Sequence, residues 1–164
     1  MAFKEITLSV SIRVYPSDHE LTQEDRELLA KARSAAASAY APYSNFFVGA
    51  AVRHSGGAVV SGNNQENAAY PSGMCAERTA VYYAGANAPN VVIEAVAVHG
   101  YNGRATEDNP VSPCGACRQA LLEYEEKQGS PIRIILGGKT GKVLVIDSIK
   151  DLLPLSFGSK NQDL

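Results

Sequence analysis

The chain has 164 residues, 45% of them hydrophobic, which predicts a single domain with a sizeable core and excludes disorder. Its 15 basic and 17 acidic residues give a net charge of −2, which disfavours nucleic acid as a partner and favours a small molecule. No apolar run is long enough to cross a membrane, and Lys4, Glu5 and Arg13 interrupt the segment where a signal peptide needs a continuous apolar core.

The first half of the chain predicts one strand, one helix and one hairpin. Residues 6–14 alternate apolar and polar side chains, which is typical of a strand with one buried face. After them, apolar residues recur at helical spacing, which predicts a helix that begins at Thr22 and is closed by Pro42. Residues 47–52 and 58–62 then predict two strands joined by a tight glycine turn.

The second half alternates helices with strands. Helices are expected from Cys75 to Ala84 and from Cys114 to just before Gly129. The other expected elements are strands over 91–98, 131–136 and 142–146, a polar loop over 101–112, a glycine turn over 137–141 and a helical turn over 148–153. Strands interleaved with helices predict an α/β fold, and the hairpin requires the sheet to be mixed.

Two cysteine motifs carry the clearest chemical signal. Cys75-Ala76-Glu77-Arg78 stands upstream, and Pro113-Cys114-Gly115-Ala116-Cys117 follows after a long gap. Three thiolates can hold a tetrahedral Zn²⁺ and leave the fourth position for a water, whose protons Glu77 can move. This order of residues is the signature of zinc-dependent deaminases. Three cysteines are an odd number, which disfavours a disulfide framework and favours a reducing cytoplasm.

Other interpretations of these residues remain open at this point. The two cysteines of Cys-x-x-Cys also suit a redox pair or buried thiols, but a closed structural zinc site needs a fourth ligand. The three histidines, at positions 19, 54 and 99, do not have ligand spacing. Glu77 also suits a first-turn glutamate favoured by the helix dipole. Arg78 suits either a surface ion pair or a hydrogen-bond donor to a ligand sulfur.

A run of polar residues, Gly62 to Asn67, follows the second hairpin strand. Asparagines are common in turns, and that is the simplest interpretation. The amide of Asn64 and the carboxylate of Glu66 also suit the recognition of hydroxyl groups, because the first both donates and accepts and the second accepts twice. A sugar is the ligand that this pair predicts.

Taken together, these segments resemble a cytidine deaminase of the short, homotetrameric, three-cysteine type. The matching segments span residues 22–158 and lie at 39–44, 48–51, 66–68, 70–71, 75–80, 112–119, 152–154 and 156–158. The resemblance implies a three-layer sandwich in which a mixed five-stranded sheet has helices on both faces, plus an extra N-terminal strand. It divides the single domain, 1–164, into an N-terminal extension over 1–18 and a catalytic core over 22–158.

The resemblance also assigns roles. It implies one Zn²⁺ per chain on Cys75, Cys114 and Cys117, with Glu77 as the proton shuttle. It implies substrate contacts from Phe46, Asn64, Glu66 and Ala76, and contacts across subunit interfaces from Tyr70 and Phe157. Phe47, Asn63 and Gln65 depart from the usual residues of the family at the pocket rim.

The expected reaction is therefore hydrolytic deamination of cytidine and deoxycytidine in pyrimidine salvage, by attack of a water on C4 of the base. The expected partner is a pyrimidine nucleoside, with no nucleic acid and no membrane. A deaminase of modified nucleosides, a deaminase of bases inside RNA or DNA, and a non-catalytic zinc-binding module are the alternatives.

Overall fold

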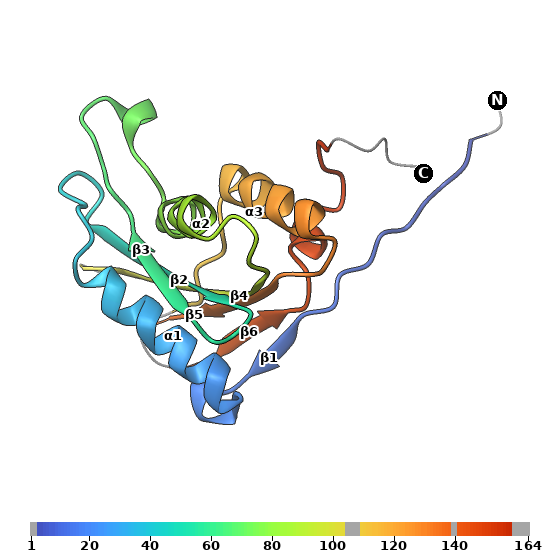
Figure 1. Cartoon of the computed structure of the whole chain (residues 1–164), viewed down its shortest axis with the longest axis horizontal. Helices are drawn as coiled ribbons and strands as arrows, with labels where there is room; N and C mark the ends of the chain where they lie inside the picture. The colour runs from blue at the N-terminus through green and yellow to red at the C-terminus, as the bar shows by residue number, and fades with distance from the viewer. Residues whose placement is uncertain (1–2, 104–108, 139–140, 159–164) are drawn as a thin grey trace.

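The structure is a computed structural model that describes residues 3–103, 109–138 and 141–158, and it forms one mixed sheet between two helical layers (Figure 1). Six strands lie in the order β1-β6-β5-β4-β2-β3. Strands β4 and β5 are parallel, and the other neighbouring pairs are antiparallel. The strands are β1 Arg13–Tyr15, β2 Phe46–His54, β3 Val59–Asn63, β4 Ile93–Asn102, β5 Arg133–Gly137 and β6 Val143–Ile146. The helices are α1 Gln23–Ala36, α2 Ala76–Asn87 and α3 Gly115–Gln128, with short 3₁₀ turns η1 Asp18–Glu20, η2 Tyr70–Ser72 and η3 Ile149–Leu152.

The sheet is buried on both faces, which confirms the predicted three-layer sandwich. Helix α1 covers one face, and α2 and α3 cover the other (Figure 1). Neighbouring residues of the central strand β2 therefore enter different cores: Ala51 packs with α1, whereas Ala50 and Val52 pack with α2 and α3. Strands buried on both faces become continuous apolar runs, which is the pattern of the sequence in β2 and β4.

Two glycines let the helices lie directly on the sheet. A Cβ atom on Gly62 of β3 would stand 2.7 Å from the backbone nitrogen of Ala80, and one on Gly49 of β2 would stand 2.0 Å from the carbonyl oxygen of Ala32. Real Cβ atoms do not approach other atoms so closely, so any larger residue would push the helix away. Gly62 thus sets the distance between β3 and α2. Because α2 begins directly after Cys75, the same contact also helps to position this cysteine.

Helix α1 begins as predicted and ends early. The Thr22 side chain accepts a hydrogen bond from the backbone N–H of Asp25, which is the expected cap. The helix stops at Ala36, however, and does not reach Pro42. The reason is tertiary, because the backbone of Tyr40 pairs with the loop after β3: its N–H donates to Asn64 O, and its carbonyl accepts from the N–H of Glu66.

The predicted N-terminal strand is wrong in length and in burial. Only Arg13–Tyr15 pairs with β6, and residues 6–12 are extended and exposed. The partner strand β6 has four residues, so within the described part of the chain no strand pairs with the earlier part of the segment. The side chains of Ile6, Leu8, Val10 and Ile12, expected on a buried face, are 42–50% exposed.

The remaining elements differ little from expectation. Strand β4 continues through Tyr101 and Asn102, where the sequence predicts a loop, because both residues pair with the start of β2. Part of that loop, 104–108, and residues 139–140 of the expected glycine turn lie outside the described residues. None of the helices that the structure describes is long and apolar enough to span a bilayer.

Candidate functional site

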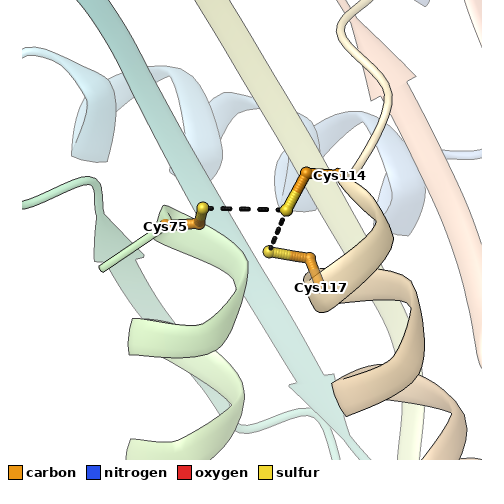
Figure 2. Close-up of side chains that lie close together, drawn as sticks. All are labelled: Cys75, Cys114 and Cys117. Carbon is orange, nitrogen blue, oxygen red and sulfur yellow. Dashed lines mark hydrogen bonds between the residues drawn. The ribbon is translucent and has the colours of Figure 1, made fainter. Parts of the chain in front are cut away.

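The three cysteines meet where two helices begin (Figure 2). Cys75 is the residue before α2, Cys114 is the residue before α3, and Cys117 lies in the first turn of α3. The sulfur of Cys114 is 3.9 Å from that of Cys75 and 3.5 Å from that of Cys117. The three sulfurs all lie within 4.8 Å of one another. The fold therefore brings together residues that are 39 positions apart in the sequence.

These sulfur positions fit a zinc ion. The sulfurs of a tetrahedral site with Zn–S bonds of ~2.3 Å stand ~3.8 Å apart, close to the observed spacings. The cysteines are free thiols, and 3.5 Å is far longer than a disulfide bond. Unpaired N–H groups at the two helix starts also favour the thiolate form that metal binding requires.

Electrostatics around the thiols point the same way. Hydrogen bonds from the Cys117 thiol and from Arg78 lower the pKa of Cys75 to about 5. The same pairing with Cys75, together with burial, raises the pKa of Cys117. Cys75 is therefore the more acidic of the two thiols, and the thiolate is the form in which a cysteine binds a metal. The Arg78 guanidinium lies 3.7 Å from the Cys75 sulfur, where its positive charge offsets part of the negative charge of a thiolate.

Glu77 lies in the first turn of α2, two residues after Cys75, and is only 4% exposed. Burial raises the pKa of its carboxyl group, and the negative charge of Cys75 raises it further. A surface glutamate that only serves the helix dipole would face water. The burial of Glu77 beside the thiols therefore favours a proton-transfer role over the simpler interpretation.

A pocket of about 320 Å³ opens beside Cys75. It brings Cys75 and Arg78 together with the predicted sugar-binding residues and with Tyr70. Its lining residues are Asn64, Gln65, Glu66, Asn67, Tyr70, Gly73, Met74, Cys75 and Arg78. A second pocket of similar size, about 330 Å³, lies at the opposite end of α3, between Glu126, Pro131 and Lys150, and has no cysteine. The residues that line the pocket beside Cys75 therefore make it the candidate substrate site.

Asn64 and Glu66 also hold the pocket wall together. The Asn64 amide accepts a hydrogen bond from Val48 N–H at 2.8 Å and donates one to Phe46 O at 2.9 Å. The Glu66 carboxylate accepts from Tyr43 N–H at 2.9 Å, and hydrogen bonds from Ser44 and Tyr43 lower its pKa. Sequence reasoning assigned both residues to a ligand and did not foresee these structural bonds, because their partners are 16 to 23 residues away.

The other predicted contacts occupy different surroundings. Phe46 is half-buried at the start of β2 and packs against the core under α2 and α3. The side chain of Ala76 is fully buried, so only its backbone can meet a substrate. Tyr70 is 78% exposed, and its ring meets Tyr43 edge to face at 6.2 Å. Phe157 is 86% exposed and does not line the pocket of its own chain.

The two residues that follow the second cysteine motif, Arg118 and Gln119, have a role that the sequence did not reveal. Arg118 donates to the carbonyls of Pro113 and Leu152 at 2.9 and 2.8 Å. Gln119 donates to the carbonyl of Phe157 at 2.7 Å. The start of α3 therefore holds the C-terminal segment as well as two thiols. The sequence signal is only the proximity of these polar residues to Cys117, because two of the three acceptors, the carbonyls of Leu152 and Phe157, are more than 30 positions away.

Comparisons with known proteins agree with this chemistry. The family model described as "Cytidine and deoxycytidylate deaminase zinc-binding region" matches residues 22–129. A cytidine deaminase of Halalkalibacterium halodurans is 37% identical over 140 residues, which cover 85% of this chain and 98% of that protein. One from Mycobacterium tuberculosis is 35% identical over 80% of this chain and 87% of its own length. The crystal structure of cytidine deaminase from Burkholderia pseudomallei is 40% identical and superimposes with a TM-score of 0.71, covering 84% of this chain and all of that one.

Proposed function

Because this chain belongs to the cytidine deaminase family, we propose that it hydrolyses cytidine and deoxycytidine to uridine and deoxyuridine with release of ammonia. The observation that carries the proposal is the meeting of three thiols and a buried glutamate at two helix starts, with Cys75 on the edge of a pocket that Asn64 and Glu66 also line. In this proposal the arrangement supplies a metal, a proton carrier and hydroxyl-recognising side chains to one small molecule.

Cys75, Cys114 and Cys117 are the residues that hold the zinc ion in this proposal. When bound, zinc supplies the Lewis acidity that makes a water nucleophilic at neutral pH. Arg78 donates toward the Cys75 sulfur and lessens the electron density of the thiolate ligands. Glu77 takes a proton from the attacking water, delivers it to N3 of the base, and then helps to protonate the departing ammonia. Its burial keeps these transfers away from bulk water.

The pocket holds the nucleoside through its sugar. An amide nitrogen carries two hydrogens, and Asn64 uses one of them on Phe46 O, so the second is free to donate to a ribose hydroxyl. The Glu66 carboxylate already accepts hydrogen bonds from the backbone N–H groups of Tyr43 and Ser44, and it can accept another from a sugar hydroxyl. Phe46 borders the base and sugar, and the backbone of Ala76 contacts the substrate. Binding energy at the sugar orients the base for reaction.

The decisive test is the release of ammonia from cytidine by zinc-loaded protein, with Glu77→Gln as the matched control. Glutamine keeps the shape but does not shuttle protons, so turnover should fall by about 10⁴-fold while zinc is retained. No turnover by the unmutated protein would favour a non-catalytic zinc module. Turnover of modified nucleosides or of bases in a strand, but not of cytidine, would favour the other deaminases.

We also propose a homotetramer in which each site is completed by neighbouring chains. Tyr70 and Phe157, whose large rings project into water, are the residues that would reach across. Light scattering that finds a fully active monomer would contradict this assembly. The proposal further places the protein in the cytoplasm, as one domain with its catalytic core over 22–158, in pyrimidine salvage.

A further inference from the structure

The N-terminal segment, residues 3–12, leaves the body of the protein as an extended arm (Figure 1). It continues β1, which is the edge strand of the sheet and pairs with β6 on one side only. Phe3 is 87% exposed, and the apolar side chains that follow it are about half exposed. Among the described residues, no strand pairs with the arm, so its backbone N–H and C=O groups also face water.

The arm has the sequence of a paired strand. Ile6, Leu8, Val10 and Ile12 occupy one face, and Thr7, Ser9, Ser11 and Arg13 occupy the other. Proteins normally cover, shorten or charge an exposed edge of this kind because it invites pairing with another chain. Here the charged residues stand at the two ends of the apolar run and leave its centre uncharged.

We propose that the arm pairs antiparallel with the arm of a second copy of this chain, with Ser9 opposite Ser9. In this register Ile6 faces Ile12 and Leu8 faces Val10, while Thr7 faces Ser11. The same register sets Glu5 opposite Arg13, an ion pair, and Phe3 opposite Tyr15, an aromatic pair. The apolar centre of the arm and the Glu5–Arg13 pair therefore favour the same alignment, in which Lys4 faces Val14 at the end of the apolar face.

Other registers are poorer. A shift by one residue sets the apolar side chains opposite serines and threonines, because strand side chains alternate between faces. A shift by two residues restores the faces but separates Glu5 from Arg13. The Arg13 guanidinium also pairs with Asp147 at the end of β6, so in the proposed register two carboxylates flank it.

The geometry of the two chains allows this pairing. From Phe3 to Tyr15 an extended chain covers ~40 Å, which keeps the two bodies apart. The first residues of each arm then lie beside β1 of the other chain, on the edge that β6 leaves open. The sheet of one chain thus continues into that of the other. At each end of the paired arms three strands lie side by side: the arm of one chain, then β1 and β6 of the other. Three strands are more stable than an isolated two-stranded ribbon. This pairing is independent of the proposed deaminase activity, which rests on residues 46–157.

Single cysteines on the polar face of the arm test the register. Directly opposed residues of an antiparallel pair have Cα atoms ~4.5–5.5 Å apart, which suits a disulfide. In the full-length, zinc-loaded chain, Ser9→Cys should therefore form a covalent dimer under mild oxidation, seen on a non-reducing gel. The matched control Ser11→Cys should not, because the two thiols would lie four residues, or ~13 Å, apart.

A hetero-pair gives an independent check of the same register. Co-expressed chains with Thr7→Cys and Ser11→Cys should link to each other, although neither variant links to itself. Equal linking of Ser9→Cys and Ser11→Cys, or no linking of Ser9→Cys, would overturn the proposal. Zinc content and turnover of cytidine should stay unchanged in all variants, so a failed cross-link cannot be confused with a failed active site.

Discussion

Glu125 is a buried acid whose loss should destabilise the protein without touching the chemistry. Its side chain is 5% exposed near the end of α3. One carboxylate oxygen accepts from the backbone N–H groups of Ile132 and Ile149, at 2.7 and 3.1 Å, and the other accepts from the hydroxyl of Ser148. Glu125 thus ties α3 to the segment that enters β5 and to η3.

The size of the effect follows from these donors. Ile132 and Ile149 are both 0% exposed, so after Glu125→Ala their N–H groups have neither an acceptor nor water. An unsatisfied buried donor costs about 1–3 kcal/mol, which gives about 2–6 kcal/mol for the two. The half-buried Ser148 can turn its hydroxyl toward solvent. This loss is a large part of the 5–15 kcal/mol that typically stabilises a domain.

Glu125→Gln is the matched control. The amide oxygen can accept from both N–H groups while the amide nitrogen donates to Ser148, so only the charge assistance is lost, at about 1 kcal/mol. Urea unfolding followed by circular dichroism, on zinc-loaded protein at one fixed concentration, compares the variants. A cost below about 1 kcal/mol for the alanine variant, or equal costs for both variants, would refute the reasoning. The zinc content and the turnover per folded protein of the glutamine variant should match those of the original.

The remaining predictions concern the site. Elemental analysis should find one zinc per chain. Replacement of Cys75, Cys114 or Cys117 by serine should remove the zinc and lower the midpoint of thermal unfolding, because the metal holds the two helix starts together. Active protein that contains far less than one zinc per chain would contradict this ligand set. Free cytosine should be a poor substrate, and Glu66→Ala should reduce the ratio of kcat/KM for cytidine to kcat/KM for cytosine. Equal turnover of both substrates by the unmutated enzyme would contradict the proposed sugar site. Phe157→Ala should keep zinc and raise KM for cytidine. An unchanged KM would contradict the proposed contact of Phe157 with the site of a neighbouring chain.

The local pattern of the sequence was enough to predict the elements and the metal ligands. Period-two and helical spacing predicted the strands and helices of the sheet, because both patterns arise from short-range backbone geometry. The cysteine motifs with Glu77 predicted the metal centre, because the order and spacing of ligands reflect the chemistry they must perform. The structure brings the three thiols together as expected.

Tertiary structure alone decided where these patterns stop and what the polar residues contact. Helix α1 ends at Ala36 because Tyr40 finds backbone partners after β3, and the N-terminal strand shortens because β6 is short. The bonds of Asn64, and the burial of Glu125 under three donors, join residues that are distant in sequence. A single sequence records which groups can form hydrogen bonds, but only the packed fold selects their partners, because a buried polar group must take the partner that lies within reach.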